Sequence, residues 1–166
     1  MNSLSRPVVF GAILLFVGHL AWAKGVTVRI TVTGPSLEEP LQITDPGVVR
    51  EFSIWSGPNS RWRFRDGTTK TDYSRIYIDF PGGIVDAPED TLYFNVEFHI
   101  ARTPADEPDT ATYKVRYAIN PARAGGYFYL PNGNPFIHHG VEDSWFRSTE
   151  SWENLVRPII EGAISN

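Results

Sequence analysis

Two adjacent histidines, His138 and His139, are followed closely by the carboxylates of Glu142 and Asp143. Imidazole and carboxylate groups are ordinary zinc ligands, so this stretch is the best candidate for a metal site or for the acid and base of a hydrolase. Neighbouring residues of a strand point to opposite faces, however, so the two histidines could share one ion only on irregular backbone. We therefore favour structural or surface roles for them and expect no cofactor.

A second stretch, residues 61–65, reads Arg-Trp-Arg-Phe-Arg and is followed by Asp-Gly, a dipeptide suited to a tight hairpin turn. Guanidinium groups bind phosphate, sulfate or carboxylate, and aromatic faces stack on rings. Arg61, Trp62, Arg63 and Arg65 are therefore candidate contacts for an anionic glycan or an acidic protein. The alternative is a hairpin whose aromatic rings enter the core and whose arginines remain in water.

Two tyrosines, Tyr127 and Tyr129, lie on one face of a short strand, with Phe128 and Leu130 on the other. If the tyrosines are exposed they could stack on sugars, which makes them candidate ligand-binding residues. If they are covered, the sheet has a second layer. We favour the covered arrangement, because the chain carries more apolar faces than one helix can hide.

Several function classes lack support in the sequence. The 166 residues contain no cysteine, which excludes disulfides, thiolate metal sites and a cysteine nucleophile. The chain has no Gly-x-Ser-x-Gly, no phosphate-binding loop, no dinucleotide fingerprint and no His-Glu-x-x-His. Its formal net charge of −4 argues against a nucleic-acid partner.

The first 23 residues differ in kind from the rest. Arg6 precedes an apolar run over residues 8–20, and Ala21-Trp22-Ala23 matches a small-x-small cleavage site. The run is shorter than a membrane-spanning helix requires, so we expect a signal peptide over 1–23 and no stable membrane insertion after cleavage. Residues 24–166 are then one secreted or periplasmic domain.

Residues 91–100 form the stretch that must position any site, because apolar and polar side chains alternate there as in a half-buried strand. The side chains expected in the core are Leu92, Phe94, Val96, Phe98 and Ile100. The opposite face carries Tyr93, Asn95, Glu97 and His99, which is the first place to look for a site on regular structure.

Other segments share this period. Residues 25–33 are expected to bury Val26, Val28, Ile30 and Val32, and residues 73–80 alternate like a strand through Ile76 and Ile78. Residues 112–119 alternate as well, with Tyr113, Val115, Tyr117 and Ile119 on one side and Thr112, Lys114, Arg116 and Ala118 on the other. Residues 91–100, 112–119, 127–130 and 136–139 together predict an antiparallel meander of about four strands joined by short turns.

Two helices complete the prediction. Thr44-Asp45-Pro46 has the capping residue and early proline of a short helix. At the C-terminus, an amphipathic stripe is formed by Trp152, Leu155, Val156, Ile159, Ile160 and Ala163, with a kink or break expected at Pro158. The fold class is α+β, mainly antiparallel β in a meander or sandwich-like sheet, with the C-terminal helix packed on the sheet.

Four phrases of the chain resemble a set of small exported bacterial proteins of unknown function. They are Leu-Gln-Ile-Thr-Asp-Pro at 41–46, Phe-Ser-Ile-Trp-Ser-Gly-Pro at 52–58, Ser-Trp-Phe-Arg at 144–147 and Val-Arg-Pro-Ile-Ile at 156–160. The resemblance implies a recurring fold and carries over no activity and no site residue.

The residues together favour a non-catalytic binding or interaction module of the cell envelope or exterior, with a glycan or another envelope protein as its partner. The alternative is a hydrolase-type or metal-dependent enzyme that uses His138 or His139 with Glu142 or Asp143.

Overall fold

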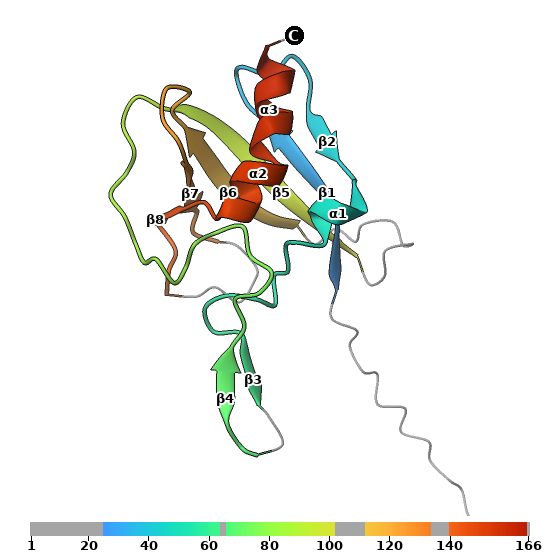
Figure 1. The fold of residues 1–166 in the computed structure, drawn as a ribbon, viewed down its shortest axis with the longest axis vertical. Helices are drawn as coiled ribbons and strands as arrows, with labels where there is room; N and C mark the ends of the chain where they lie inside the picture. The colour runs from blue at the N-terminus through green and yellow to red at the C-terminus, as the bar shows by residue number, and fades with distance from the viewer. Residues whose placement is uncertain (1–24, 64–65, 102–111, 134–139, 166) are drawn as a thin grey trace, which may run out of the picture.

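The fold is built on one antiparallel sheet with the strand order β2-β1-β5-β6-β7-β8 (Figure 1). The computed structural model describes residues 25–63, 66–101, 112–133 and 140–165. The strands are β1 Val26–Thr33, β2 Leu41–Ile43, β5 Leu92–Ala101, β6 Thr112–Ile119, β7 Gly126–Leu130 and β8 Ser144–Arg147. The predicted α+β class is confirmed. The strand expected at 136–139 lies outside the described residues, and β8 is the strand that pairs with β7.

The alternation in β5 sets the core, as the sequence predicts. Phe94, Val96 and Phe98 are at most 1% exposed, and they lie opposite Tyr117, Val115 and Tyr113 of β6. Because the apolar residues of both strands share one side of the sheet, their burial leaves the other side to polar and aromatic residues.

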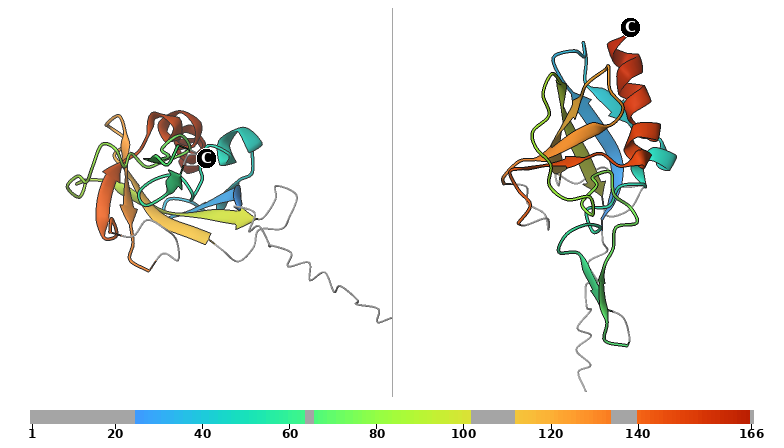
Figure 2. Two further views of the ribbon diagram at one scale, coloured as in Figure 1. Left: turned by 90° about the horizontal axis from the view of Figure 1, so that it is seen from below. Right: turned by 60° about the vertical axis from the view of Figure 1, so that its left-hand side comes forward.

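The three helices lie on the same side of the sheet, within the bend between its two halves (Figure 2). They are α1 Pro46–Val49, α2 Glu150–Leu155 and α3 Arg157–Ile164. Asp45 caps α1 by accepting hydrogen bonds from the backbone N–H groups of Gly47 and Val48 at 2.7 and 3.1 Å. The C-terminal helix breaks at Val156, two residues before Pro158, which confirms the expected break.

Only part of the stripe expected on the C-terminal helices reaches the core. Trp152, Val156 and Ile160 are fully buried, whereas Leu155 and Ile159 are 37% and 36% exposed. The predicted stripe was therefore too wide, because the buried residues follow one line at a spacing of four and Leu155 and Ile159 lie beside that line.

Strand β1 departs from the simple alternation. A register shift between Thr27 and Arg29 leaves Val28 as an extra residue opposite β5, so Thr27 becomes buried and Val26 and Val28 are only half-buried. The Thr27 hydroxyl donates to the carbonyl of Phe52 at 2.9 Å, which satisfies the buried polar group.

Residues 73–80 do not form a strand, so that prediction was wrong. Ile76, Tyr77 and Ile78 are consecutive and all buried, since the segment passes between β8 and the helices instead of lining one sheet face. The Tyr77 hydroxyl donates to the carbonyl of Val48 at 2.6 Å, and the Thr149 N–H donates to the Tyr77 carbonyl at 2.9 Å.

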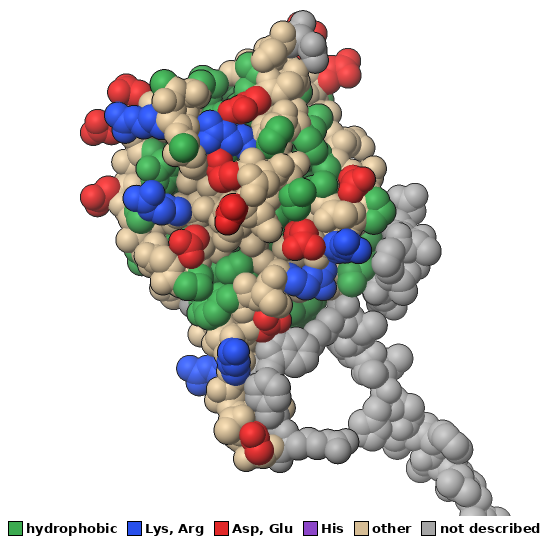
Figure 3. Space-filling model, in the orientation of Figure 1, with side chains coloured by type: hydrophobic (Ala, Val, Ile, Leu, Met, Phe, Trp, Pro, Cys, Tyr) green, Lys and Arg blue, Asp and Glu red, His purple; other side chains and the backbone are tan. Residues whose placement is uncertain are grey.

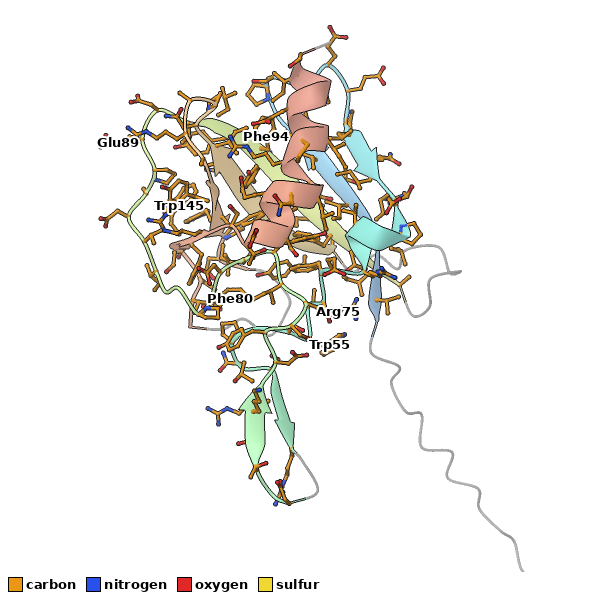
Figure 4. All side chains as sticks on the ribbon, in the orientation of Figure 1. Trp55, Arg75, Phe80, Glu89, Phe94 and Trp145 are labelled. Carbon is orange, nitrogen blue, oxygen red and sulfur yellow. The ribbon has the colours of Figure 1, made fainter. Side chains whose placement is uncertain are left out.

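Strands β3 Arg61–Arg63 and β4 Thr69–Thr71 form the predicted hairpin, which projects from the main body (Figure 1). We call this hairpin the arm. Gly67 has a φ of 85°, as its turn requires, and Trp55 and Arg75 lie near the root of the arm (Figure 4). Over the described residues, the helices are all too short or too polar to cross a bilayer.

Candidate functional site

The candidate site is the side of the sheet that faces away from the helices, which we call the open face. No described helix or strand lies on it. Its side chains are those that alternate with the buried core residues. They are Arg29, Thr31, Thr33, Tyr93, Asn95, Glu97, His99, Lys114, Arg116, Tyr127, Tyr129, Trp145 and Arg147.

The strand register arranges part of this face into two rows across β5, β6, β7 and β8. One row runs Asn95, Arg116, Tyr129, Trp145. The next row, two residues along each strand, runs Tyr93, Ala118, Tyr127, Arg147. Directly opposite side chains lie about 5 Å apart at Cβ, so each row is a line of neighbouring groups.

Three aromatic rings of these rows form a cluster. The ring centroid of Trp145 lies 5.2 Å from that of Tyr129 and 6.2 Å from that of Tyr93. Tyr93 is 41% exposed. Ala118, which lies between Tyr93 and Tyr127 in the second row, has a small side chain that is fully buried. Figure 4 shows Trp145 at the β8 side of the molecule, away from the α2–α3 pair.

Two arginines lie over tyrosine rings on the same face. The guanidinium carbon of Arg116 is 5.9 Å from the ring centroid of Tyr129, and that of Arg147 is 6.0 Å from the centroid of Tyr127. Both distances are in the range of cation–π contacts. Each arginine is exposed, so the contact orients the guanidinium group while leaving it accessible.

A cavity of about 280 Å³ opens beside the aromatic cluster and shares Arg116 and Tyr129 with it. The other residues that line it are Thr33, Asn95, Val96, Glu97, Lys114, Val115 and Pro131. Lys114 Nζ lies 2.8 Å from Glu97 Oε1, so the two charges in the cavity wall form an ion pair.

Tyr129 is fixed at its hydroxyl end. Its hydroxyl donates to Asp143 Oδ1 at 3.0 Å, and this hydrogen bond raises the pKa of Tyr129 above its ordinary value. Asp143 follows a loop and has a φ of 56°, and its N–H donates to the Leu130 carbonyl at 2.8 Å. The Tyr129 ring is therefore held in place by Asp143 at one end and by β7 at the other.

His99 lies at the β1 side of the open face. Its Nε2 is 2.9 Å from the Thr31 hydroxyl oxygen, and its Nδ1 is 3.4 Å from a guanidinium nitrogen of Arg29. Burial, and then the charge of Arg29, lower the pKa of His99, so the ring is neutral at pH 7. The sequence interpretation of His99 as a polar neighbour agrees with these contacts.

The candidate residues from the sequence fall on different surfaces. Tyr127 and Tyr129 lie on the open face, and the second sheet layer that we expected over them is not found among the described residues. Arg61 and Arg63 are exposed on the arm, which projects away from β7 in Figure 1 and in the right-hand view of Figure 2. Arg65 and the side chain of Trp62 lie outside the described residues.

The proposed metal ligands His138 and His139 also lie outside the described residues. Glu142 is described, and its Oε2 accepts a hydrogen bond from the Gly140 N–H. Within the ranges that the structure covers, no group of three or more His, Cys, Asp or Glu side chains could hold an ion. The metal hypothesis therefore stays a prediction.

Sequence reasoning missed four members of the face: Lys114, Arg116, Trp145 and Arg147 were not named as ligand contacts. The alternation in residues 112–119 placed Lys114 and Arg116 opposite the apolar stripe, so a signal for them was present. Trp145 and Arg147 carried no such signal, because a strand of four residues, Ser144–Arg147, is too short to show a period.

The helix-covered side has a polar cluster of its own, centred on Glu153. The Tyr117 hydroxyl donates to Glu153 Oε1 at 3.0 Å, Arg157 donates to Oε2 at 2.9 Å, and the Ser148 hydroxyl also bonds to Oε1. These groups satisfy one another and join the C-terminal helices to the sheet. Elsewhere on this side, charged and hydrophobic side chains are interspersed over the surface (Figure 3).

Comparison of the chain with models of known protein families, with curated proteins and with solved structures found no match.

Proposed function

We propose that this protein is an exported, non-catalytic binding domain that binds a glycan through the open face of its sheet. The observation that carries the proposal is the aromatic cluster of Tyr93, Tyr129 and Trp145 beside a polar cavity, on a face with no described helix or strand over it. Export rests on the leader-like composition of residues 1–23.

A sugar presents apolar C–H faces and hydroxyl-bearing edges, so its binding site needs flat apolar groups next to hydrogen-bonding ones. Trp145 and Tyr93 offer apolar ring surface with little side-chain freedom to lose. Asn95, Glu97 and Lys114 offer donors and acceptors in the adjoining cavity. The three tilted rings, at interplanar angles of 42° and 53°, suit a ligand with several faces better than one flat ring.

Catalysis has less support on this face. Glycoside hydrolysis uses two carboxyl groups flanking the scissile bond, and Glu97 is the one carboxylate among the described residues that line the cavity. Glu97 is also engaged in an ion pair with Lys114, whose Nζ lies 2.8 Å from its Oε1.

The Thr31–His99 pair also lacks the arrangement of a nucleophile and its base. A catalytic histidine needs an acceptor, usually a carboxylate, at its second nitrogen to stabilise the imidazolium ion. Here that nitrogen faces the cation of Arg29 at 3.4 Å, which opposes a positive charge on the ring.

The test is a binding assay of the purified protein on a panel of neutral and acidic polysaccharides, with the variants Tyr129→Ala and Trp145→Ala. Central aromatic contacts often contribute 2 kcal/mol or more, so each variant is expected to bind about tenfold or more weakly to the glycan that the parent binds. The control is Tyr73→Ala, because Tyr73 is an exposed tyrosine, at 41%, that lies outside the open face.

The thermal unfolding of each variant is measured alongside, to separate a lost contact from a lost fold. Binding to no glycan of the panel, or equal binding by the parent and both open-face variants, would contradict the proposal.

A further inference from the structure

We infer that the glycan is acidic, and that Arg116 and Arg147 bind carboxylate groups on different sugar units of one chain. This inference rests on the proposed function and deepens it. It follows from the charge, the pairing and the spacing of the cations on the open face.

The open face has the opposite charge to the chain as a whole. The chain has a formal net charge of −4. On the open face, the four cations Arg29, Lys114, Arg116 and Arg147 accompany two carboxylates, that of Glu97 and that of Asp143, which accepts the Tyr129 hydrogen bond. A locally positive surface on an acidic protein attracts anions to that place.

The pairing of these charges shows which cations remain for a ligand. Glu97 neutralises Lys114 at 2.8 Å. Arg29 lies against His99 at the edge of the face. Arg116 and Arg147 form no ion pair with a carboxylate among the described residues, and each is exposed over a tyrosine ring. A guanidinium group held in this way presents its N–H fork, which matches a carboxylate with two parallel hydrogen bonds.

The spacing of the two arginines sets the size of the ligand. Arg116 lies on β6 opposite Tyr129, and Arg147 lies on β8 opposite Tyr127, so they are two strands and two residues apart. Each guanidinium group lies over its own tyrosine ring, and the two tyrosines are two residues, about 7 Å, apart on β7. One uronic acid unit carries one carboxylate, so two guanidinium groups over separate rings call for an oligosaccharide with charges on separate units.

A nucleic acid fits the face less well. Phosphate binding draws on many cations at once, and here two available arginines lie on an acidic protein, with Glu97 and Asp143 close by.

The test compares polygalacturonate and alginate, each beside its fully esterified neutral form, in calorimetric titrations of the purified protein. We expect at least one acidic polymer to bind about tenfold or more tightly than its ester, because a hydrogen bond to a charged group contributes about 1.5–3 kcal/mol. The difference should shrink as salt is raised.

The variants Arg116→Gln and Arg147→Gln are each expected to weaken binding of the acidic polymer about tenfold and binding of the ester by a smaller factor, so that the preference for the acid over its ester falls. Arg50→Gln is the matched control, because Arg50 is a highly exposed arginine that follows α1 on the helix-covered side. Short oligomers should compete for the site, whereas the single uronic acid should not.

Each contrary result has a distinct meaning. Equal binding of the acid and its ester, or binding confined to neutral glycans, would overturn this inference and leave the proposed function standing. Equal binding of polyglutamate or single-stranded DNA would identify a general polyanion site and overturn the inference. Equal competition by the single uronic acid would overturn the two-arginine arrangement. Failure of every glycan to bind would overturn both proposals.

Discussion

At the scale of single residues, Gly126 shows how closely the sheet and its cover are packed. Gly126 begins β7 and lies against the ring of the fully buried Tyr117. A Cβ atom at this position would lie 2.4 Å from Tyr117 Cε2 and 2.5 Å from its hydroxyl oxygen. Since Tyr117 is also hydrogen-bonded to Glu153, the ring cannot move away without breaking the polar cluster that holds the C-terminal helices.

Gly126→Ala is therefore expected to destabilise the protein by about 1–3 kcal/mol, the usual cost of overpacking a core. The matched control is Gly162→Ala on α3, which is exposed and would meet no atom within 4 Å. That change should stabilise by about 0.5–1 kcal/mol, because alanine loses less freedom than glycine in a helix. Urea unfolding of the three proteins measures both effects, and equal stability of the Gly126→Ala variant and the parent would contradict the packing described.

At the scale of elements, the C-terminal helices pack against the rest of the fold mainly through Trp152. The Trp152 ring meets the rings of Tyr77, Tyr117 and Phe128 edge-on, with centroids 5.1, 5.0 and 4.8 Å away. These partners come from the 76–80 segment, β6 and β7. Trp152 therefore joins parts of the chain that are far apart in sequence.

Trp152→Ala is expected to cost about 3–5 kcal/mol, as for other buried aromatic truncations. Ile159→Ala, in the helix that follows, should change stability by less than about 1 kcal/mol, because Ile159 is 36% exposed. Equilibrium unfolding monitored by circular dichroism distinguishes the two. A larger loss of stability for Ile159→Ala than for Trp152→Ala would contradict this packing. It would mean that α3 packs on the sheet through the side that carries Ile159.

The elements also show what the sequence could predict and what it could not. The strict alternation of β5 and β6 gave their faces correctly, because a long half-buried strand has a period that one sequence reveals. Thr27 was misplaced because a bulge depends on the partner strand. Ile76, Tyr77 and Ile78 were misjudged because a segment covered on all sides has no alternation to follow.

The candidate site was predictable to a similar extent. The sequence pointed to Tyr127 and Tyr129 and to the mixed side of residues 91–100, which the sheet register brings onto one face. It could not show that Trp145 and Arg147 join them, since that pairing is a long-range contact between β7 and β8.

At the scale of the whole molecule, the two sides of the sheet differ in what covers them. The helices, the 76–80 segment and the Glu153 cluster seal one side, which accounts for the core. The other side keeps exposed or half-buried tyrosines, exposed arginines and a cavity that the core does not require. A binding domain needs such a rigid scaffold with a separate, accessible face, and the central claim is that this face holds a glycan.

The most direct test is a two-dimensional NMR titration of the ¹⁵N-labelled protein with a short oligomer of the tightest-binding polysaccharide. We predict that the largest shifts fall on the open face, at Asn95, Arg116, Tyr129 and Trp145, while the amides of α2, α3 and the arm stay unchanged. Shifts confined to the helices or to Arg61 and Arg63 of the arm, or no shifts at saturating ligand, would contradict the account.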